Sequence, residues 1–202
     1  MKTATNSGLI LYGLIVLLCV VTGCREQTTE PKQAVNFFSM SVNGQTWKPS
    51  QSAQDPCFGT FWMQYGSAGG TPRYLFLAYY DSLGRADFRS QDVLIMQVMG
   101  ITKPGTYSLT GTWKSNFESY TIFRRQLPNG QSRRYVNDPA RGSFTVTVSE
   151  WYIRPSSVII PSLRGTFSGT LYAEENPSDS VVIRRGGMAF IRPTSSTDQC
   201  DY

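Results

Sequence analysis

The 202-residue sequence contains no histidine. Histidine is the commonest general base of enzymes and the commonest protein ligand of metals, so Ser-His-Asp and Cys-His nucleophilic sets are excluded. Charged residues make up only 16% of the chain, and they form neither a carboxylate-pair motif nor the spacing of a calcium loop. We therefore predict no enzyme, no metal site and no cofactor. The alternative to a non-enzyme is a histidine-independent hydrolase that acts through carboxylates.

Helical periodicity is also missing. Outside the N-terminal apolar run, short segments alternate apolar and polar residues with the period of two that is typical of half-buried strands. Turn-forming residues separate them, and Asn43-Gly44 is a strong hairpin turn. We predict a single all-β domain, an antiparallel β-sandwich with a flattened β-barrel as the alternative. The expected strands cover 37–42, a return from Trp47, 58–65, 73–81, 92–100, 105–111, 119–126, 131–138, 142–151, 164–175 and 180–191.

Two of these segments, RYLFLAYYD (73–81) and DVLIMQVMG (92–100), are apolar on both faces. This pattern predicts central strands that are covered on both sides. The GSAGGTP stretch (66–72) consists of turn-forming residues and predicts a loop between two strands.

The one long apolar run lies near the N-terminus. Lys2 precedes a run at residues 8–21, which is shorter than the roughly 20 residues that a membrane-spanning helix needs. This arrangement is typical of a secretory signal peptide. Its end, Val21-Thr22-Gly23-Cys24, resembles the bacterial lipobox, and the resemblance implies cleavage before Cys24 and attachment of diacylglycerol to its thiol. The alternative is a plain signal peptide in which Cys24 is incidental.

These features divide the chain into three parts. We predict a lipoprotein signal peptide (1–23), the lipidated cysteine with a short flexible tether of polar residues (24–35), and one β-rich domain (36–202). The expected location is the cell envelope, with the protein bound to the membrane by its lipid. Arg25 stands where enteric inner-membrane lipoproteins carry aspartate, which favours the outer membrane.

Two of the four cysteines remain once Cys19 leaves with the signal peptide and Cys24 is lipidated. Cys57 and Cys200 are then a pair in an exported protein, which predicts one disulfide. Two free thiols are the alternative.

A basic hairpin is the first candidate site. Two strands flank Leu127-Pro128-Asn129-Gly130, and pairing around this turn would place Arg125 near Arg133. Like charges opposite each other destabilise a hairpin, so an anion is expected to offset them. The alternative is a solvated edge whose charges prevent aggregation. The candidate anion-binding residues are Arg124, Arg125, Arg133, Arg134 and Arg141.

Aromatic side chains are the second candidate. Most of them are expected to pack in the core and across strands, as aromatics usually do in β domains. Trp113 lies in the turn-rich stretch TGTWKSN and is the one that we expect to be exposed, where it could stack on a sugar ring.

Several short motifs resemble those of β-rich envelope lipoproteins of unknown function from Bacteroidota. They are the opening Phe38-x-x-x-Val42-Asn43-Gly44-x-x-Trp47, the G-x-Y-x-L element at 105–109, and strands at 142–148, 165–169 and 181–190. The resemblance covers most of residues 37–190. It implies a shared fold and an envelope location, and it brings no catalytic residues.

The combined expectation is a lipid-anchored envelope protein whose β domain is a non-catalytic binding or accessory module for a glycan or a protein partner. The alternative is a structural envelope component that contacts anionic lipid or lipopolysaccharide through the basic hairpin. Nucleic acid is not expected as a partner, because the chain is exported and carries no known nucleic-acid-binding module.

Overall fold

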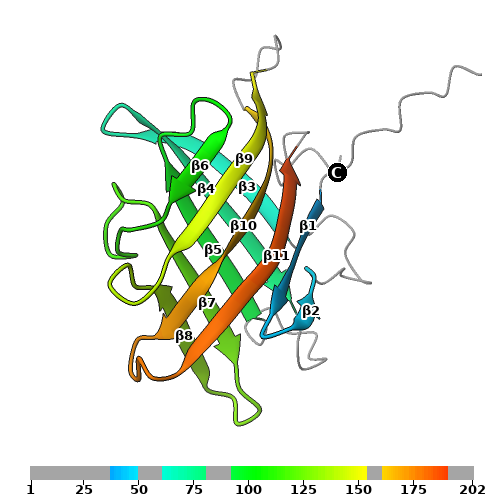
Figure 1. Cartoon of the computed structure of the whole chain (residues 1–202), viewed down its shortest axis with the longest axis vertical. Helices are drawn as coiled ribbons and strands as arrows, with labels where there is room; N and C mark the ends of the chain where they lie inside the picture. Colours follow the sequence, from blue (N-terminus) through cyan, green and yellow to red (C-terminus); the bar gives the residue numbers. More distant parts are fainter. Residues whose placement is uncertain (1–36, 50–60, 81–91, 154–160, 191–202) are drawn as a thin grey trace, which may run out of the picture. The chain divides into compact units, whose positions relative to one another are not determined.

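The computed structural model describes residues 37–49, 61–80, 92–153 and 161–190, all within the compact unit that begins at Val35. These residues form antiparallel strands of one sheet (Figure 1). The described ranges contain no helix of the length and hydrophobicity needed to cross a membrane. The strands are β1 (Phe37–Val42), β2 (Gln45–Trp47), β3 (Phe61–Ala68), β4 (Thr71–Tyr80), β5 (Asp92–Met99), β6 (Gly105–Ser108), β7 (Tyr120–Gln126), β8 (Ser132–Asn137), β9 (Phe144–Tyr152), β10 (Ser162–Ala173) and β11 (Ser180–Phe190).

The sheet follows the order β2-β1-β11-β10-β8-β7-β5-β4-β3 and forks at β10. The first part of β10, residues 162–169, pairs with β9, which pairs in turn with β6. The last part of β10, residues 171–173, pairs with β8. Segment 109–119 connects β6 on one branch to β7 on the other. This segment therefore lies at the fork.

The sheet curls until side chains from its two halves meet. The ring of Phe38 in β1 lies 6.3 Å from that of Phe61 in β3, and Phe190 in β11 lies 5.4 Å from Phe76 in β4. Figure 1 shows β9, β10 and β11 passing in front of β3, β4 and β5. A core between two facing halves is common to a sandwich and a flattened barrel. The expectation of an all-β, antiparallel domain is confirmed.

Local patterns located the strands well. The Asn43-Gly44 turn has φ of 49° and 85°, the left-handed values that this dipeptide tolerates. In β9, alternate residues Phe144, Val146 and Val148 are buried, as their spacing predicted. The hairpin around Pro128-Asn129-Gly130 also forms, because β7 pairs with β8.

Two expectations were wrong. The 66–72 stretch is not a loop, because β3 continues to Ala68 and β4 resumes at Thr71 after a two-residue turn. Gly69 and Gly70 both take positive φ, and this lets the strands run on to the turn. β4 is not a central strand covered on both faces either. It lies next to the edge strand β3, and side chains on its outer face such as Leu75 and Leu77 are only half-buried.

Candidate functional site

The basic hairpin has the register that its sequence predicts. Arg125 pairs with Arg133, and Arg124 pairs with Arg134 across β7 and β8. Successive residues of a strand point to opposite faces, so these two pairs lie on opposite faces of the sheet. The arginines therefore do not form one continuous cationic surface.

Acidic residues of the chain itself offset much of this charge. Arg133 forms an ion pair with Asp179, and Arg134 forms one with Glu174 at 3.0 Å. Both acids lie in the connection between β10 and β11. The hydroxyl of Tyr135 also donates a hydrogen bond to Asp179, at 3.1 Å. The repulsion across the hairpin is thus reduced without an external anion.

The remaining arginines differ from one another. Arg141 pairs with Asp138 at 3.0 Å and lies 6.0 Å from the ring centre of Tyr172. The Nε atom of Arg124 is enclosed and has no hydrogen-bond partner among the described residues. No carboxylate in the described ranges forms an ion pair with Arg124 or Arg125. These two side chains lie on opposite faces of the sheet, so the five predicted arginines do not form one anion site.

Trp113 is half-buried and belongs to the same cluster. The guanidinium of Arg134 lies 4.4 Å from the centre of its ring, and its indole N–H donates to Glu174 Oε1 at 2.7 Å. One face of the indole is therefore covered by a cation, and its polar edge is already bonded. Less ring surface is left for a sugar than the sequence predicted.

A shallow open depression lies beside the 109–119 segment. Its volume is about 360 Å³, within the usual range for small-ligand sites. Met99 ends β5, Ser108 ends β6, and the connecting segment supplies the rest of the wall. Phe117 is the most exposed large hydrophobic residue that the structure describes, at 67%. The lining residues are Met99, Ser108, Thr110, Gly111, Phe117, Glu118 and Ser119.

Two buried amides hold this segment in place. The side chain of Asn137 accepts a hydrogen bond from Thr121 N at 2.7 Å and donates to the carbonyls of Leu109 and Gly111 at 3.0 and 2.9 Å. From the other side, Gln97 in β5 donates to the carbonyl of Glu118 at 2.9 Å. These bonds connect the backbone of the segment to both neighbouring strands. Hydrogen bonds to neighbouring strands therefore hold the wall of the depression in place at the fork.

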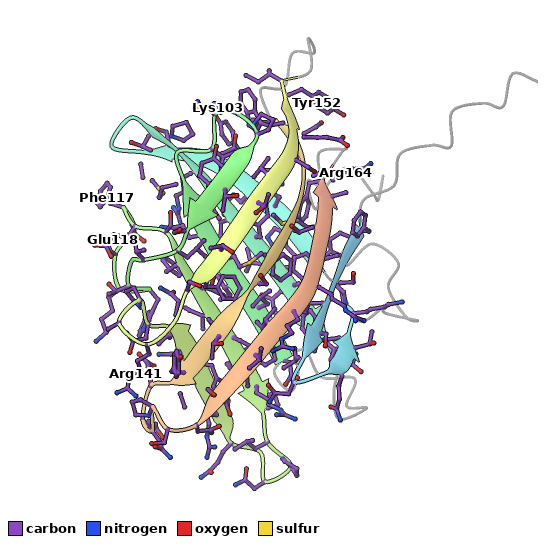
Figure 2. All side chains as sticks on the ribbon, viewed as in Figure 1. Lys103, Phe117, Glu118, Arg141, Tyr152 and Arg164 are labelled. Atoms are coloured by element: carbon purple, nitrogen blue, oxygen red, sulfur yellow. The ribbon has the colours of Figure 1, made fainter. Side chains whose placement is uncertain are left out.

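The carboxylate of Glu118 is oriented by the backbone around it. Its Oε2 atom accepts a hydrogen bond from Thr112 N at 2.7 Å, and Gly111 N donates to the carbonyl of Ser119 at 2.8 Å. Figure 2 shows Glu118 and Phe117 on the same side of the molecule. The ring of Phe117 reaches the turn at Gly69, where an added Cβ would lie 3.6 Å from it. The carboxylate of Glu118 and the ring of Phe117 both line the depression.

The chemistry of this wall fits a polyhydroxylated ligand. Serine and threonine hydroxyls and a carboxylate offer donors and acceptors, and an exposed ring offers a stacking face. Glu118 is one of the carboxylates that form no motif in the sequence, and the other lining residues, Phe117, Ser108, Thr110 and Ser119, carried no sequence signal of their own. The only signal was the turn-rich composition of the segment. Within the described residues, no three acidic, cysteine or histidine side chains come together as a metal ion would require.

Three predicted site residues, Cys24, Cys57 and Cys200, lie outside the described residues. The lipidation site and the disulfide therefore stay predictions.

A family model matches residues 35–190, nearly all of the β domain. Its description is a domain of unknown function, DUF5025. The chain belongs to the DUF5025 family. No curated protein and no solved structure matches it significantly. Because the family has no assigned function, membership in it identifies no substrate or partner.

Proposed function

We propose that this DUF5025 protein is a lipid-anchored component of the cell envelope whose β domain is a non-catalytic binding module for a glycan. The observation that carries the proposal is the depression walled by Phe117 and Glu118. The lipobox-like Val21-Thr22-Gly23-Cys24 supports the anchor, and Arg25 favours the outer membrane. Such a protein holds its partner at the membrane surface and leaves it chemically unchanged.

The geometry favours a neutral sugar over an anion at this depression. Glu118 would accept hydrogen bonds from hydroxyls and would repel phosphate or carboxylate groups. Phe117 presents a ring to the C–H face of a pyranose, and the nearby hydroxyls match its polar edge. A protein partner could use the same exposed ring, and the binding experiment includes that outcome.

The test is binding of the full-length, detergent-solubilised protein to an array of envelope glycans. Phe117→Ala and Glu118→Gln are each expected to weaken binding about tenfold, or about 1.4 kcal/mol. Matched controls are Phe37→Ala and Glu175→Gln, which change the same residue types outside the depression and should leave binding intact. Equal binding by all four variants would refute the site. Competition by an envelope protein at the same two residues would replace the glycan with a protein partner.

The second candidate function is contact with anionic lipid or lipopolysaccharide through the basic hairpin. It is favoured by Arg125, which lacks an ion-pair partner among the described carboxylates. The expected result is salt-sensitive sedimentation of a Cys24→Ala variant with phosphatidylglycerol vesicles that is reduced when Arg125→Gln is added. The control is Arg184→Gln, an exposed arginine of β11 outside the hairpin. Unchanged sedimentation of Arg125→Gln would rule this function out.

A further inference from the structure

Exposed apolar side chains gather at one end of the β domain. Phe37, Tyr152 and Ile153 are 42%, 41% and 51% exposed, although large hydrophobic residues in this fold are mostly buried. Exposure of apolar side chains to water is unfavourable, so a group of them on the surface of a domain marks an interaction surface. The question is which partner this end of the domain meets.

The strand register brings these residues to the same end of the sheet. Phe37 pairs with Ala189, Ala189 with Arg164, and Arg164 with Glu150, in one row across four strands. Tyr152 follows Glu150 by two positions and therefore lies on the same face, farther toward the end. Arg164 and Glu150 form an ion pair at 3.5 Å.

Basic residues accompany the apolar ones. Lys103 lies two residues before β6, which starts opposite Val148 of β9, so it lies near the same end of the sheet. Figure 2 shows Lys103, Tyr152 and Arg164 at this end. Tyrosine and isoleucine beside lysine and arginine are typical of surfaces that enter the headgroup region of a bilayer. We name this surface, made of Phe37, Lys103, Tyr152, Ile153 and Arg164, the anchor-side end.

The chain enters the domain at the anchor-side end. Phe37 is the first residue of β1 and follows the predicted lipidated Cys24 by thirteen positions. A polar coil of that length has a root-mean-square span of about 20 Å. A lipid on Cys24 would therefore keep this end within about 20 Å of the bilayer most of the time.

The basic hairpin lies far from this point. Arg164, near the start of β10, lies in the same row as Phe37. Nine residues farther along β10, Ala173 pairs with Tyr135 of β8. Arg133 lies two residues farther along β8, in the direction away from Phe37. Eleven residues of strand separate the two levels, or about 36 Å. Thirteen residues reach at most about 45 Å when fully extended. A domain standing on this hairpin would therefore need a tether that is almost straight.

We propose that the anchor-side end rests on the bilayer, with Tyr152 and Ile153 in the headgroup region and Lys103 facing lipid phosphates. This inference rests on the lipid anchor of the proposed function. Contact at this end would hold the domain upright, with the basic hairpin pointing away from the lipid surface. The lipid anchor would keep the side chains of the anchor-side end close to the bilayer, so that their contact with it becomes nearly intramolecular and the two contacts strengthen each other.

The experiment uses the full-length protein purified from membranes and reconstituted in phosphatidylcholine–phosphatidylglycerol vesicles. A lipid with a diazirine at headgroup level is photoactivated, and the cross-linked peptides are mapped by mass spectrometry. Adducts are expected on the peptide that contains 150–153 and on the one that begins β1, with few on 127–134. Ile153→Asp should lose most adducts at this end, whereas the control Phe117→Asp, an exposed hydrophobic elsewhere, should keep them.

The outcomes test the lipid anchor and the orientation of the domain separately. Adducts concentrated on 127–134, or spread evenly over the domain, would overturn the orientation. The mass of the N-terminal peptide is read from the same sample. If Cys24 carries no acyl group, the anchor itself is wrong, and the orientation fails with it. If Cys24 is acylated and the adducts lie elsewhere, only the orientation is wrong.

Discussion

Replacing Asn137 by alanine should both destabilise the domain and loosen the wall of the depression. Asn137 ends β8 at the fork, where its side chain makes three hydrogen bonds to the backbone of β7 and of the 109–119 segment. Alanine leaves Thr121 N and two carbonyl oxygens without these partners. The side chain of Asn137 is buried, so water cannot replace all three bonds easily.

The magnitude follows from the number of bonds. Each hydrogen bond contributes about 1 kcal/mol net, and an unsatisfied buried group costs about 1–3 kcal/mol. Asn137→Ala is therefore expected to lower the free energy of unfolding by about 3 kcal/mol. With a urea dependence of about 2 kcal/mol per M, the midpoint of unfolding should fall by about 1.5 M.

The assay is urea unfolding combined with hydrogen exchange. The matched control is Asn129→Ala in the exposed hairpin turn, where Asn129 Oδ1 accepts from Gln131 N at 3.0 Å and the expected loss is about 0.5 kcal/mol. Amides of segment 109–119 should exchange faster in Asn137→Ala and remain unchanged in Asn129→Ala. Equal midpoints for the two variants, or unchanged exchange in the segment, would refute the role given to Asn137.

Three other perturbations test the packing and the charge of the domain. Burial raises the pKa of Tyr74 to about 12, so the unfolded chain loses this proton near pH 10 while the folded chain keeps it. The free energy of unfolding should therefore fall between pH 10 and 12, by up to about 3 kcal/mol, and a Tyr74→Phe variant with the same decline would contradict this. Gly165→Ala would place a Cβ 2.5 Å from the carbonyl oxygen of Thr147 and should cost at least about 2 kcal/mol; an unchanged melting temperature would show that the strands separate easily. Arg134→Ala removes the cation over Trp113 and should cost about 1 kcal/mol and shift the tryptophan emission to the red, whereas unchanged emission would mean that the stack does not persist in solution.

The strands were predictable because their signals are local. Alternation in FFSMSV and in residues 144–148 directly reports which face is buried, and Asn43-Gly44 reports the turn between β1 and β2. The outer face of β4 misled the prediction because its leucines are apolar without being fully covered. The sequence shows that a side chain is apolar, but which residues pack on it depends on the order of the strands in the sheet.

The candidate site was much less predictable. The hairpin register brought Arg125 and Arg133 together as expected, but Asp179 lies 46 positions after Arg133, and no local pattern connects the two. The depression was even less predictable from the sequence, because its walls come from the ends of β5 and β6 and from the segment that joins the branches. Long-range pairing at the fork creates it.

The central claim is that this DUF5025 protein works from the membrane surface, attached through Cys24. The most direct test is a non-reducing mass analysis of the native protein extracted from membranes. The account predicts an N-terminal peptide that begins at Cys24 and carries acyl mass, together with a peptide that joins Cys57 to Cys200. A soluble protein with an unmodified N-terminus would contradict the anchor and the orientation built on it, and free thiols at Cys57 and Cys200 would contradict the disulfide.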